Sequence, residues 1–263
     1  MNSLTPKQRR GIACVTTGVL GIGAIKAGVA GAPEASFVLA TAGSAITLIP
    51  TLLRNCPLYG QVVTSFAPEG RQVWLTIDDG PTPENTLEML EVLDRYHALA
   101  TFFGIGERIA KHPELATAIH SAGHSLQNHT FSHPVGTFWA TTRSGAATEI
   151  NECNQLIQQT TGISPLQFRA PAGLANPFLH RAVEDAGLKM VGWSASGFDG
   201  VPHAPSMVIE KIMQTVKPGA IILLHESCLK NMKPGTRAST LETLLKRLRQ
   251  EGYTTTIPSL YPA

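Results

Sequence analysis

The order of apolar and polar positions divides the chain at about residue 60. Before that point, two uncharged stretches, residues 11–25 and 35–53, are separated by a short segment that contains the only charges between them. After it, short apolar runs alternate with amphipathic stretches of helical length. We therefore predict an apolar N-terminal region, residues 1–60, followed by a second domain, residues 61–263.

The N-terminal region has the length of a helical hairpin that crosses a membrane. A helix of residues 35–53 would span about 30 Å, the thickness of the hydrocarbon core. Residues 11–25 form a second run, which extends to Pro33 if Lys26 lies near a helix end. A secretory signal peptide and a soluble helical hairpin are the alternatives, because residues 30–32 resemble a cleavage site and both runs are rich in Ala, Gly and Thr. We favour membrane attachment.

Composition and charge narrow the function classes. The whole chain carries 21 Lys and Arg against 19 Asp and Glu, which argues against a nucleic-acid binder. Its four cysteines are too scattered to predict a zinc finger or a disulfide framework. The charges of residues 1–60 are mostly basic: Lys7, Arg9, Arg10, Lys26 and Arg54 against Glu34. The positive-inside rule then places both hairpin ends and the following domain in the cytoplasm, with the periplasmic face as the alternative.

Beyond residue 70 the pattern is typical of a parallel α/β fold. The predicted strands are residues 73–77, 100–105, 125–127, 166–168, 189–193, 220–224 and 254–257. The predicted helices are residues 84–97, 113–122, 145–160, 177–186, 206–216 and 240–250. This alternation predicts βαβ units, and about seven strands favour a distorted (β/α) barrel over an open doubly wound sheet.

Polar side chains suited to catalysis follow five of the predicted strands. In chain order they are Asp78 and Asp79, His129 and His133, Arg169, Asp199, and His225. Because the carboxyl ends of parallel strands gather on one face of a barrel, we expect these side chains to share one site. Contributions from so many strands are the reason for favouring the barrel over the open sheet.

Two of these segments together predict a metal site. Asp78 and Asp79 are adjacent carboxylates at the end of a buried strand, which is unfavourable unless a cation compensates. His129 and His133 have the i, i+4 spacing that places two imidazoles on one face of a helical turn. Two histidines and one aspartate leave a position open for water, as in catalytic zinc sites, although the same set suits Fe²⁺. We expect a divalent metal, first Zn²⁺, with Co²⁺, Ni²⁺, Mn²⁺ or Fe²⁺ as alternatives.

Five segments in this order resemble the motifs of the polysaccharide deacetylases, the NodB-homology domain of carbohydrate esterase family 4. They are TIDDGP, NHTFSHP, FRAPAG, GWSASGFD and ILLHE, and the resemblance covers about residues 71–257. It implies a distorted (β/α) barrel that removes N- or O-acetyl groups from carbohydrates with a divalent metal. The apolar N-terminus with RAPAG and GFD resembles a membrane-attached bacterial subgroup, which implies the bacterial inner membrane as the location.

The resemblance also implies a role for each catalytic side chain. Asp78 would be the general base that deprotonates the attacking water, and Arg169 would hold it in place. His225 would be the general acid that protonates the leaving amine, and Asp199 would orient that histidine. The implied metal ligands are Asp79, His129 and His133.

Three residues are expected to contact the substrate. Leu223 would line the pocket for the acyl methyl group, Trp193 would form part of the wall, and a backbone amide near Ala172 would complete the oxyanion site. The chain departs from the usual pattern at Ser196, which replaces an Asp, and at Gly200, which replaces a Trp. It also departs at Ala172, where the third motif often has Tyr, and at Glu226, where the fifth usually has Asp. The loss of the Trp and the Tyr reshapes the pocket wall and makes an extended chitin-like substrate doubtful.

The function predicted from these features is N-deacetylation of a lipid-linked or envelope glycan precursor. The expected partners are an acylated carbohydrate and the membrane, with no nucleic acid and no protein partner inferred. One alternative is a deformylase acting on a lipid-linked formamido sugar. A second is a non-catalytic glycan-binding protein on the deacetylase fold, and Fe²⁺ oxygenase chemistry is a remote third.

Overall fold

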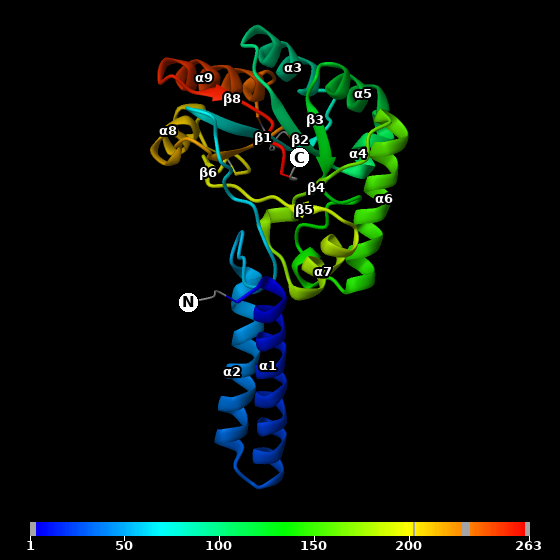
Figure 1. Ribbon diagram of the computed structural model, residues 1–263, viewed down its shortest axis with the longest axis vertical. Helices are drawn as coiled ribbons and strands as arrows, with labels where there is room; N and C mark the ends of the chain where they lie inside the picture. The colour runs from blue at the N-terminus through cyan, green and yellow to red at the C-terminus, as the bar shows by residue number, and fades with distance from the viewer. Residues whose placement is uncertain (1–3, 202, 228–231, 261–263) are drawn as a thin grey trace.

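A computed structural model of the chain describes residues 4–201, 203–227 and 232–260. Figure 1 shows two long helices, α1 (Pro6–Val29) and α2 (Pro33–Leu52), projecting as a hairpin from an α/β body. The chain turns between them at Ala30–Ala32, within the short segment that separates the two uncharged runs. Thr5 and Gln8 form a capping box that satisfies backbone donors at the start of α1.

The body is built on one parallel sheet. Its strands are β1 (Gln72–Gly80), β2 (Ala100–Gly104), β3 (Ser125–Asn128), β4 (Gln167–Phe168), β5 (Lys189–Met190), β6 (Ala195–Ser196), β7 (Ile221–His225) and β8 (Thr254–Thr255). The order is β5-β4-β3-β2-β1-β7-β6, and β8 pairs with the start of β1. The sheet curls into a half-barrel with β1 near its centre, which confirms the predicted distorted barrel (Figure 1).

Helices cover the outer face of the curled sheet. They are α3 (Thr86–Arg95), α4 (Gly106–Lys111), α5 (Pro113–Ser121), α6 (Arg143–Thr161), α7 (Pro177–Asp185), α8 (Pro205–Thr215) and α9 (Thr236–Gln250). Successive side chains of β1 point to opposite faces of the sheet. Val73, Leu75 and Ile77 join the main core, whereas Trp74 packs in a separate cluster and Asp78 lines a cavity.

The structure differs from the sequence prediction at two elements. The strand predicted at residues 189–193 ends at Met190, and the separate strand β6 follows at Ala195–Ser196. The interruption coincides with Gly192, where a Cβ atom would lie 2.4 Å from Oδ1 of Asn55, so the chain passes closely around that side chain. Helix α4 was not predicted, because six residues are too short for a clear amphipathic pattern.

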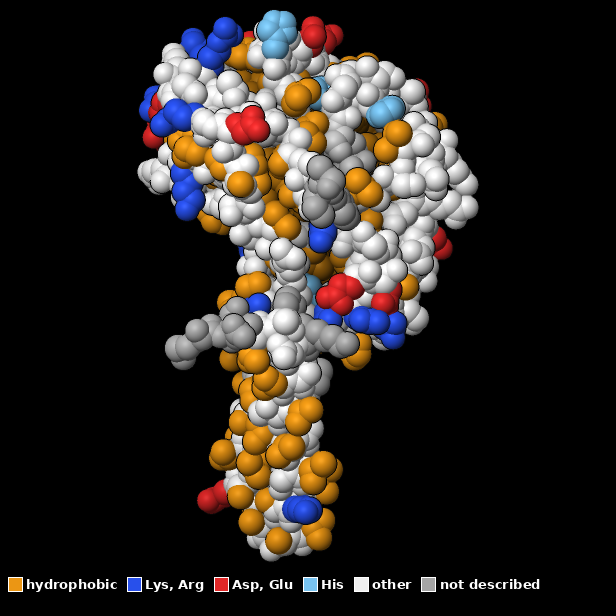
Figure 2. All heavy atoms as spheres, viewed as in Figure 1, with side chains coloured by type: hydrophobic (Ala, Val, Ile, Leu, Met, Phe, Trp, Pro, Cys, Tyr) orange, Lys and Arg blue, Asp and Glu red, His pale blue; other side chains and the backbone are white. Residues whose placement is uncertain are grey.

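The hairpin carries its apolar side chains on the outside. Val15, Val19 and Phe37 are 65%, 62% and 72% exposed, and only 12% of the apolar window of each helix is buried. Small residues lie between the helices instead, as where Gly43 meets Leu20. Figure 2 shows apolar side chains along the whole length of the helical hairpin. By length and composition both helices could cross a membrane, and a soluble core helix would have this surface buried.

The base of the hairpin contacts the α/β body through polar groups. Arg10 of α1 forms a bidentate ion pair with Glu184 of α7, at 2.9 and 2.8 Å. The backbone N–H of Asn55, just beyond α2, donates to the carbonyl of Gly173 at 2.9 Å. These contacts connect both ends of the hairpin to the same side of the body.

Candidate active site

The end of β1 is distorted so that two consecutive carboxylates reach one cavity. Successive side chains of a regular strand point to opposite faces. Here the register shifts between Asp78 and Gly80, and Asp79 takes a φ of 67°, so both aspartates line the same cavity. A Cβ atom at Gly80 would lie 2.0 Å from Oε2 of Glu226, which restricts this position to glycine.

The predicted helical turn at His129 and His133 is wrong. The segment that follows β3 is a loop in which Thr130 and His133 have φ values of 70° and 54°. Glu149 of α6 stabilises it by accepting hydrogen bonds from the backbone N–H groups of Phe131 and Ser132, at 2.9 and 2.8 Å. The loop nevertheless brings the two imidazole rings to 4.7 Å between centroids.

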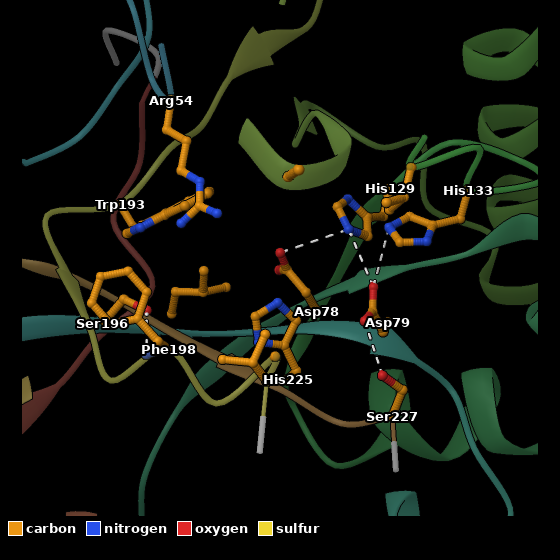
Figure 3. A pocket seen from close by; sticks show the side chains of 15 residues that line it. Arg54, Asp78, Asp79, His129, His133, Trp193, Ser196, Phe198, His225 and Ser227 are labelled. Carbon is orange, nitrogen blue, oxygen red and sulfur yellow. Dashed lines mark hydrogen bonds and ion pairs between the residues drawn. The ribbon is translucent and has the colours of Figure 1, made fainter. Parts of the chain in front are cut away.

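Asp79, His129 and His133 converge on one point. Oδ1 of Asp79 lies 3.4 Å from Nε2 of His129 and 3.3 Å from Nε2 of His133, as the dashed lines in Figure 3 show. This buried Oδ1 has no hydrogen-bond partner among the described residues, whereas Oδ2 accepts a hydrogen bond from the Ser227 hydroxyl at 2.9 Å. A buried carboxylate oxygen left unpartnered beside two imidazoles fits a metal ligand.

Electrostatics keep this set in the protonation state that a metal requires. Nδ1 of His129 donates to the carbonyl of Arg169 at 2.9 Å, which leaves the Nε2 lone pair facing Asp79. Burial, together with the charge of His129, lowers the pKa of His133 to about 4, although Asp79 opposes this. Burial by itself would raise the pKa of Asp79, but the adjacent imidazole of His129 and the positive charge of His225 hold it well below its usual range. The carboxylate is therefore ionised and His133 is neutral at pH 7.

Asp78 is held by an arginine that is completely buried. Nη1 of Arg169 donates to Oδ1 of Asp78 at 2.7 Å and to the Thr76 hydroxyl at 2.7 Å. Nε and Nη2 donate to the carbonyls of Val191 and Gly192. The guanidinium thus has partners on each nitrogen, which fixes Asp78 and compensates its charge inside the curl of the sheet.

His225 is the last residue of β7 and also lines the cavity. Its Nδ1 lies 2.8 Å from Oδ1 of Asp199, and its backbone N–H donates to Oδ2 of the same carboxylate at 2.8 Å. Burial alone would lower the pKa of His225, but the hydrogen bond and charge of Asp199 dominate and raise it to about 9. Asp199 follows β6 rather than the predicted fifth strand, so its place at a strand end comes from a strand that the sequence did not reveal.

The predicted site residues surround one cavity of about 290 Å³. Leu223, Trp193 and Ala172, the three expected substrate contacts, all line it together with the metal set, Asp78 and His225 (Figure 3). Arg169 and Asp199 do not line it, because each lies behind the side chain that it holds.

Several residues at the site were not predicted to act there. Arg237 of α9 donates to Oδ2 of Asp199 at 3.1 Å and to the carbonyl of Ser227 at 3.0 Å, so it connects the two sides of the site. Arg54, from the end of the hairpin, lines the cavity. Nothing in the sequence marks either arginine, since each reaches the site only through tertiary folding.

Glu226 occupies a position where the related motif usually has Asp. Its side chain is fully buried, and Oε1 accepts hydrogen bonds from the backbone N–H of Thr82 at 2.7 Å and from the hydroxyls of Thr82 and Thr86. Burial raises the pKa of Glu226 despite these hydrogen bonds. Because Glu226 packs against Gly80, it supports the loop that carries the two aspartates.

Comparison with known proteins gives the family of this fold and site. The profile described as "Polysaccharide deacetylase" matches residues 67–191. A chitooligosaccharide deacetylase of Rhizobium leguminosarum bv. trifolii is 33% identical over 160 residues, which cover 61% of this chain and 74% of that protein. The solved structure of the peptidoglycan deacetylase PdaC from Bacillus subtilis is similar with a TM-score of 0.64 and 27% identity, over 73% of this chain and 90% of the other.

A more distant neighbour shows the fold alone. The structure called BA3943, a CE4 family pseudoenzyme from Bacillus anthracis, has a TM-score of 0.66 and 22% identity, over 74% of this chain and 66% of the other. Carbohydrate deacetylases of this family generally use a divalent metal. The donor set of Asp79, His129 and His133 is consistent with such a metal. By its fold, its motifs and its relatives, this chain belongs to the polysaccharide deacetylase family.

Proposed function

We propose that the protein is a metal-dependent N-deacetylase that acts at a membrane surface on a lipid-linked or envelope glycan precursor. One observation carries the chemical part of the proposal. The unpartnered Oδ1 of Asp79 and the Nε2 atoms of His129 and His133 meet in the cavity that Asp78 and His225 also line. A metal set, a base and an acid around one space are the parts that amide hydrolysis needs.

The donor set fits a divalent cation with affinity for nitrogen, first Zn²⁺. Such a cation supplies Lewis-acid polarisation of the amide oxygen and lowers the pKa of water, which strengthens the nucleophile. The surrounding residues hold the ligands in place. Ser227 fixes Oδ2 of Asp79 and so leaves Oδ1 for the metal, while the carbonyl of Arg169 orients the ring of His129.

Asp78 fits the role of general base. It is 3% exposed and faces the cavity, and its second oxygen, Oδ2, is not the one bound by Arg169. Oδ2 lies 3.7 Å from Nε2 of His129, beside the proposed metal position. We therefore assign the proton taken from the attacking water to Oδ2, while Arg169 keeps the carboxylate oriented.

His225 fits the role of general acid. An amine leaves only if it is protonated, and a histidine with a pKa of about 9 carries that proton at neutral pH. Nδ1 is engaged with Asp199, so Nε2 is the atom that donates. Asp78 and His225 are register partners on the adjacent strands β1 and β7, so the base and the acid lie next to each other at the same end of the sheet.

The cavity size and wall favour a small acyl group on a single sugar unit. Its volume of about 290 Å³ is at the lower limit of common small-molecule sites, roughly 300–1,000 Å³. Leu223 is buried in the wall and provides an apolar contact for an acetyl methyl group. Trp193 offers a ring face for a sugar, and we assign the backbone near Ala172 to the oxyanion.

The membrane part of the proposal rests on the hairpin. Its outward apolar surface needs a hydrophobic environment, and two helices of this length match a hydrocarbon core of about 30 Å. A tethered enzyme meets a lipid-linked substrate at a high effective concentration. We propose the bacterial inner membrane with the catalytic side in the cytoplasm, from the basic residues at both hairpin ends.

The test removes metal ligands singly. We expect Asp79→Asn and His129→Ala to lose both bound zinc and hydrolysis of N-acetylated sugars, whereas Asp94→Asn, an exposed aspartate far from the site, retains both. Metal content is measured by atomic emission, acetate release by a coupled assay and folding by circular dichroism. If folded Asp79→Asn kept both metal and activity, the site assignment would be wrong. Stoichiometric metal without turnover by the wild type would instead favour a non-catalytic glycan-binding protein.

A further inference from the structure

Arg54 is a cation at the cavity wall that the reaction does not use. It lies two residues beyond the end of α2 and is exposed. Figure 3 shows Arg54 and Trp193 at one end of the cavity and His129 and His133 at the other. Within the described residues, Arg54 has no carboxylate partner, because Asp78 is engaged with Arg169 and Asp79 faces the two histidines.

The residue next to Arg54 fixes it to the cavity wall. Asn55 donates its backbone N–H to Gly173 at 2.9 Å and its side-chain amide to the carbonyl of Trp193 at 3.1 Å. Gly173 and Gly192 allow this approach, since a Cβ atom on either would lie 3.2 or 2.4 Å from Oδ1 of Asn55. The position of Arg54 is therefore set by the catalytic body, although it belongs to the hairpin segment.

This position corresponds to the headgroup layer if the hairpin is inserted. Consecutive Cα atoms are 3.8 Å apart, so the Cα of Arg54 lies within about 8 Å of the end of α2. A 20-residue helix that spans the hydrocarbon core leaves such a residue at the interface with water. The cavity wall and the headgroup layer then lie at the same level.

The same cavity has exposed apolar side chains at its rim. Val135, Phe198 and Val201 line the cavity, yet they are 49%, 48% and 51% exposed. A cavity that combines exposed apolar side chains with an arginine that has no carboxylate partner among the described residues suits an amphiphile with an anionic group. A neutral polysaccharide chain would use neither the charge nor the apolar rim.

We propose that Arg54 binds the phosphate that joins the substrate sugar to its lipid carrier, so that the substrate class is an acylated sugar phosphate on a lipid. This rests on the proposed deacetylase function, because the acyl group must lie at the metal set while the phosphate reaches Arg54. The guanidinium offers paired N–H donors that match phosphate oxygens. Arg54 is therefore a specificity-determining residue that recognises the anomeric phosphate.

The experiment compares Arg54→Gln and Arg54→Lys with the wild type on three substrates: a neutral N-acetylated sugar, its 1-phosphate, and the polyprenyl phosphate-linked sugar in vesicles. We expect Arg54→Gln to raise KM about tenfold or more for both phosphates and to change KM for the neutral sugar far less, since only the phosphates lose a charged hydrogen bond. Arg54→Lys should recover part of the loss, and Arg249→Gln, a control on an exposed arginine of α9, should change nothing.

Three outcomes would overturn the proposal. One is equal loss on the neutral sugar, which indicates a structural role. Another is no change with the soluble 1-phosphate but a loss in anionic vesicles, which assigns Arg54 to bilayer headgroups. The third is no effect on any substrate.

A separate measurement distinguishes failure of the proposed deacetylase function from failure of the proposal for Arg54. If the wild type hydrolyses no acylated sugar, calorimetric titration with N-acetylglucosamine 1-phosphate and with N-acetylglucosamine still tests Arg54. Tighter binding of the phosphate by the wild type than by Arg54→Gln would support the proposal, and equal or undetectable binding would overturn it.

Discussion

Each side of the cavity pairs a carboxylate with a basic side chain, but the group that faces the cavity differs between the two sides. On one side, Asp78 faces the cavity and Arg169 lies behind it. On the other, His225 faces the cavity, Asp199 lies behind it, and Arg237 lies behind Asp199. The arginine behind Asp78 orients that carboxylate and compensates its charge, whereas the carboxylate behind His225 raises the pKa of the histidine. The chemical role thus depends on which group of the pair faces the substrate.

The largest expected effect is on the base side. Asp78→Asn keeps the size of the side chain but cannot accept the proton, so kcat for an N-acetylated sugar should fall about 10²- to 10⁴-fold. Bound zinc should stay at the wild-type level, and the melting temperature monitors the weakened pair with Arg169. Loss of zinc would make Asp78 a ligand, and retention of kcat would remove it as the base.

A smaller effect, visible as a pH shift, is expected on the acid side. His225 donates only while protonated, so wild-type kcat should decline as the pH rises through about 9. Asp199→Asn removes the main cause of that high pKa and leaves burial, which lowers it, so the decline should move to lower pH. The activity lost at pH 8 should therefore exceed that lost at pH 6. An unchanged alkaline limb in the profile of kcat against pH would separate Asp199 from the acid.

The smallest catalytic effect is expected where the two sides join. Arg237→Gln removes donors to Asp199 and to the carbonyl of Ser227, whose hydroxyl holds Asp79. Since no group that contacts substrate is lost, we expect kcat to change less than about tenfold, while the free energy of unfolding falls by roughly 1–3 kcal/mol. Arg247→Gln, on an exposed face of the same helix, is the matched control. A loss of activity as large as that of Asp78→Asn would contradict the distinction between positioning and catalytic groups.

The sequence predicted the side chains that face the cavity better than those behind them. Asp78, Asp79, His129 and His225 follow apolar strands, and the rule that such ends share one face of a parallel sheet brings them together. The loop of His129 and His133 could not be derived from spacing, because its two left-handed residues depend on Glu149 in α6. The i, i+4 spacing predicted that these two histidines meet, and they do, although in a loop rather than a helical turn.

The supporting arginines were beyond prediction for a different reason. Arg237 lies 38 residues from Asp199 on an amphipathic helix, where the sequence pattern alone predicts a solvated charge. It is 4% exposed because the start of α9 packs against the segment that follows β7. Arg54 was counted only as one of the basic residues of a membrane hairpin, and its place at the cavity depends on the contacts of Asn55.

The most direct test of the account is mass spectrometry of the products that the zinc-loaded, membrane-bound protein forms from free and polyprenyl phosphate-linked acylated sugars. We predict loss of one acetyl group from a sugar, with the lipid-linked phosphate preferred and no reaction by Asp79→Asn. Removal of formyl groups alone would replace the deacetylase with a deformylase on the same site. A protein that binds zinc at Asp79, His129 and His133 but removes no acyl group from any of these sugars would contradict the account.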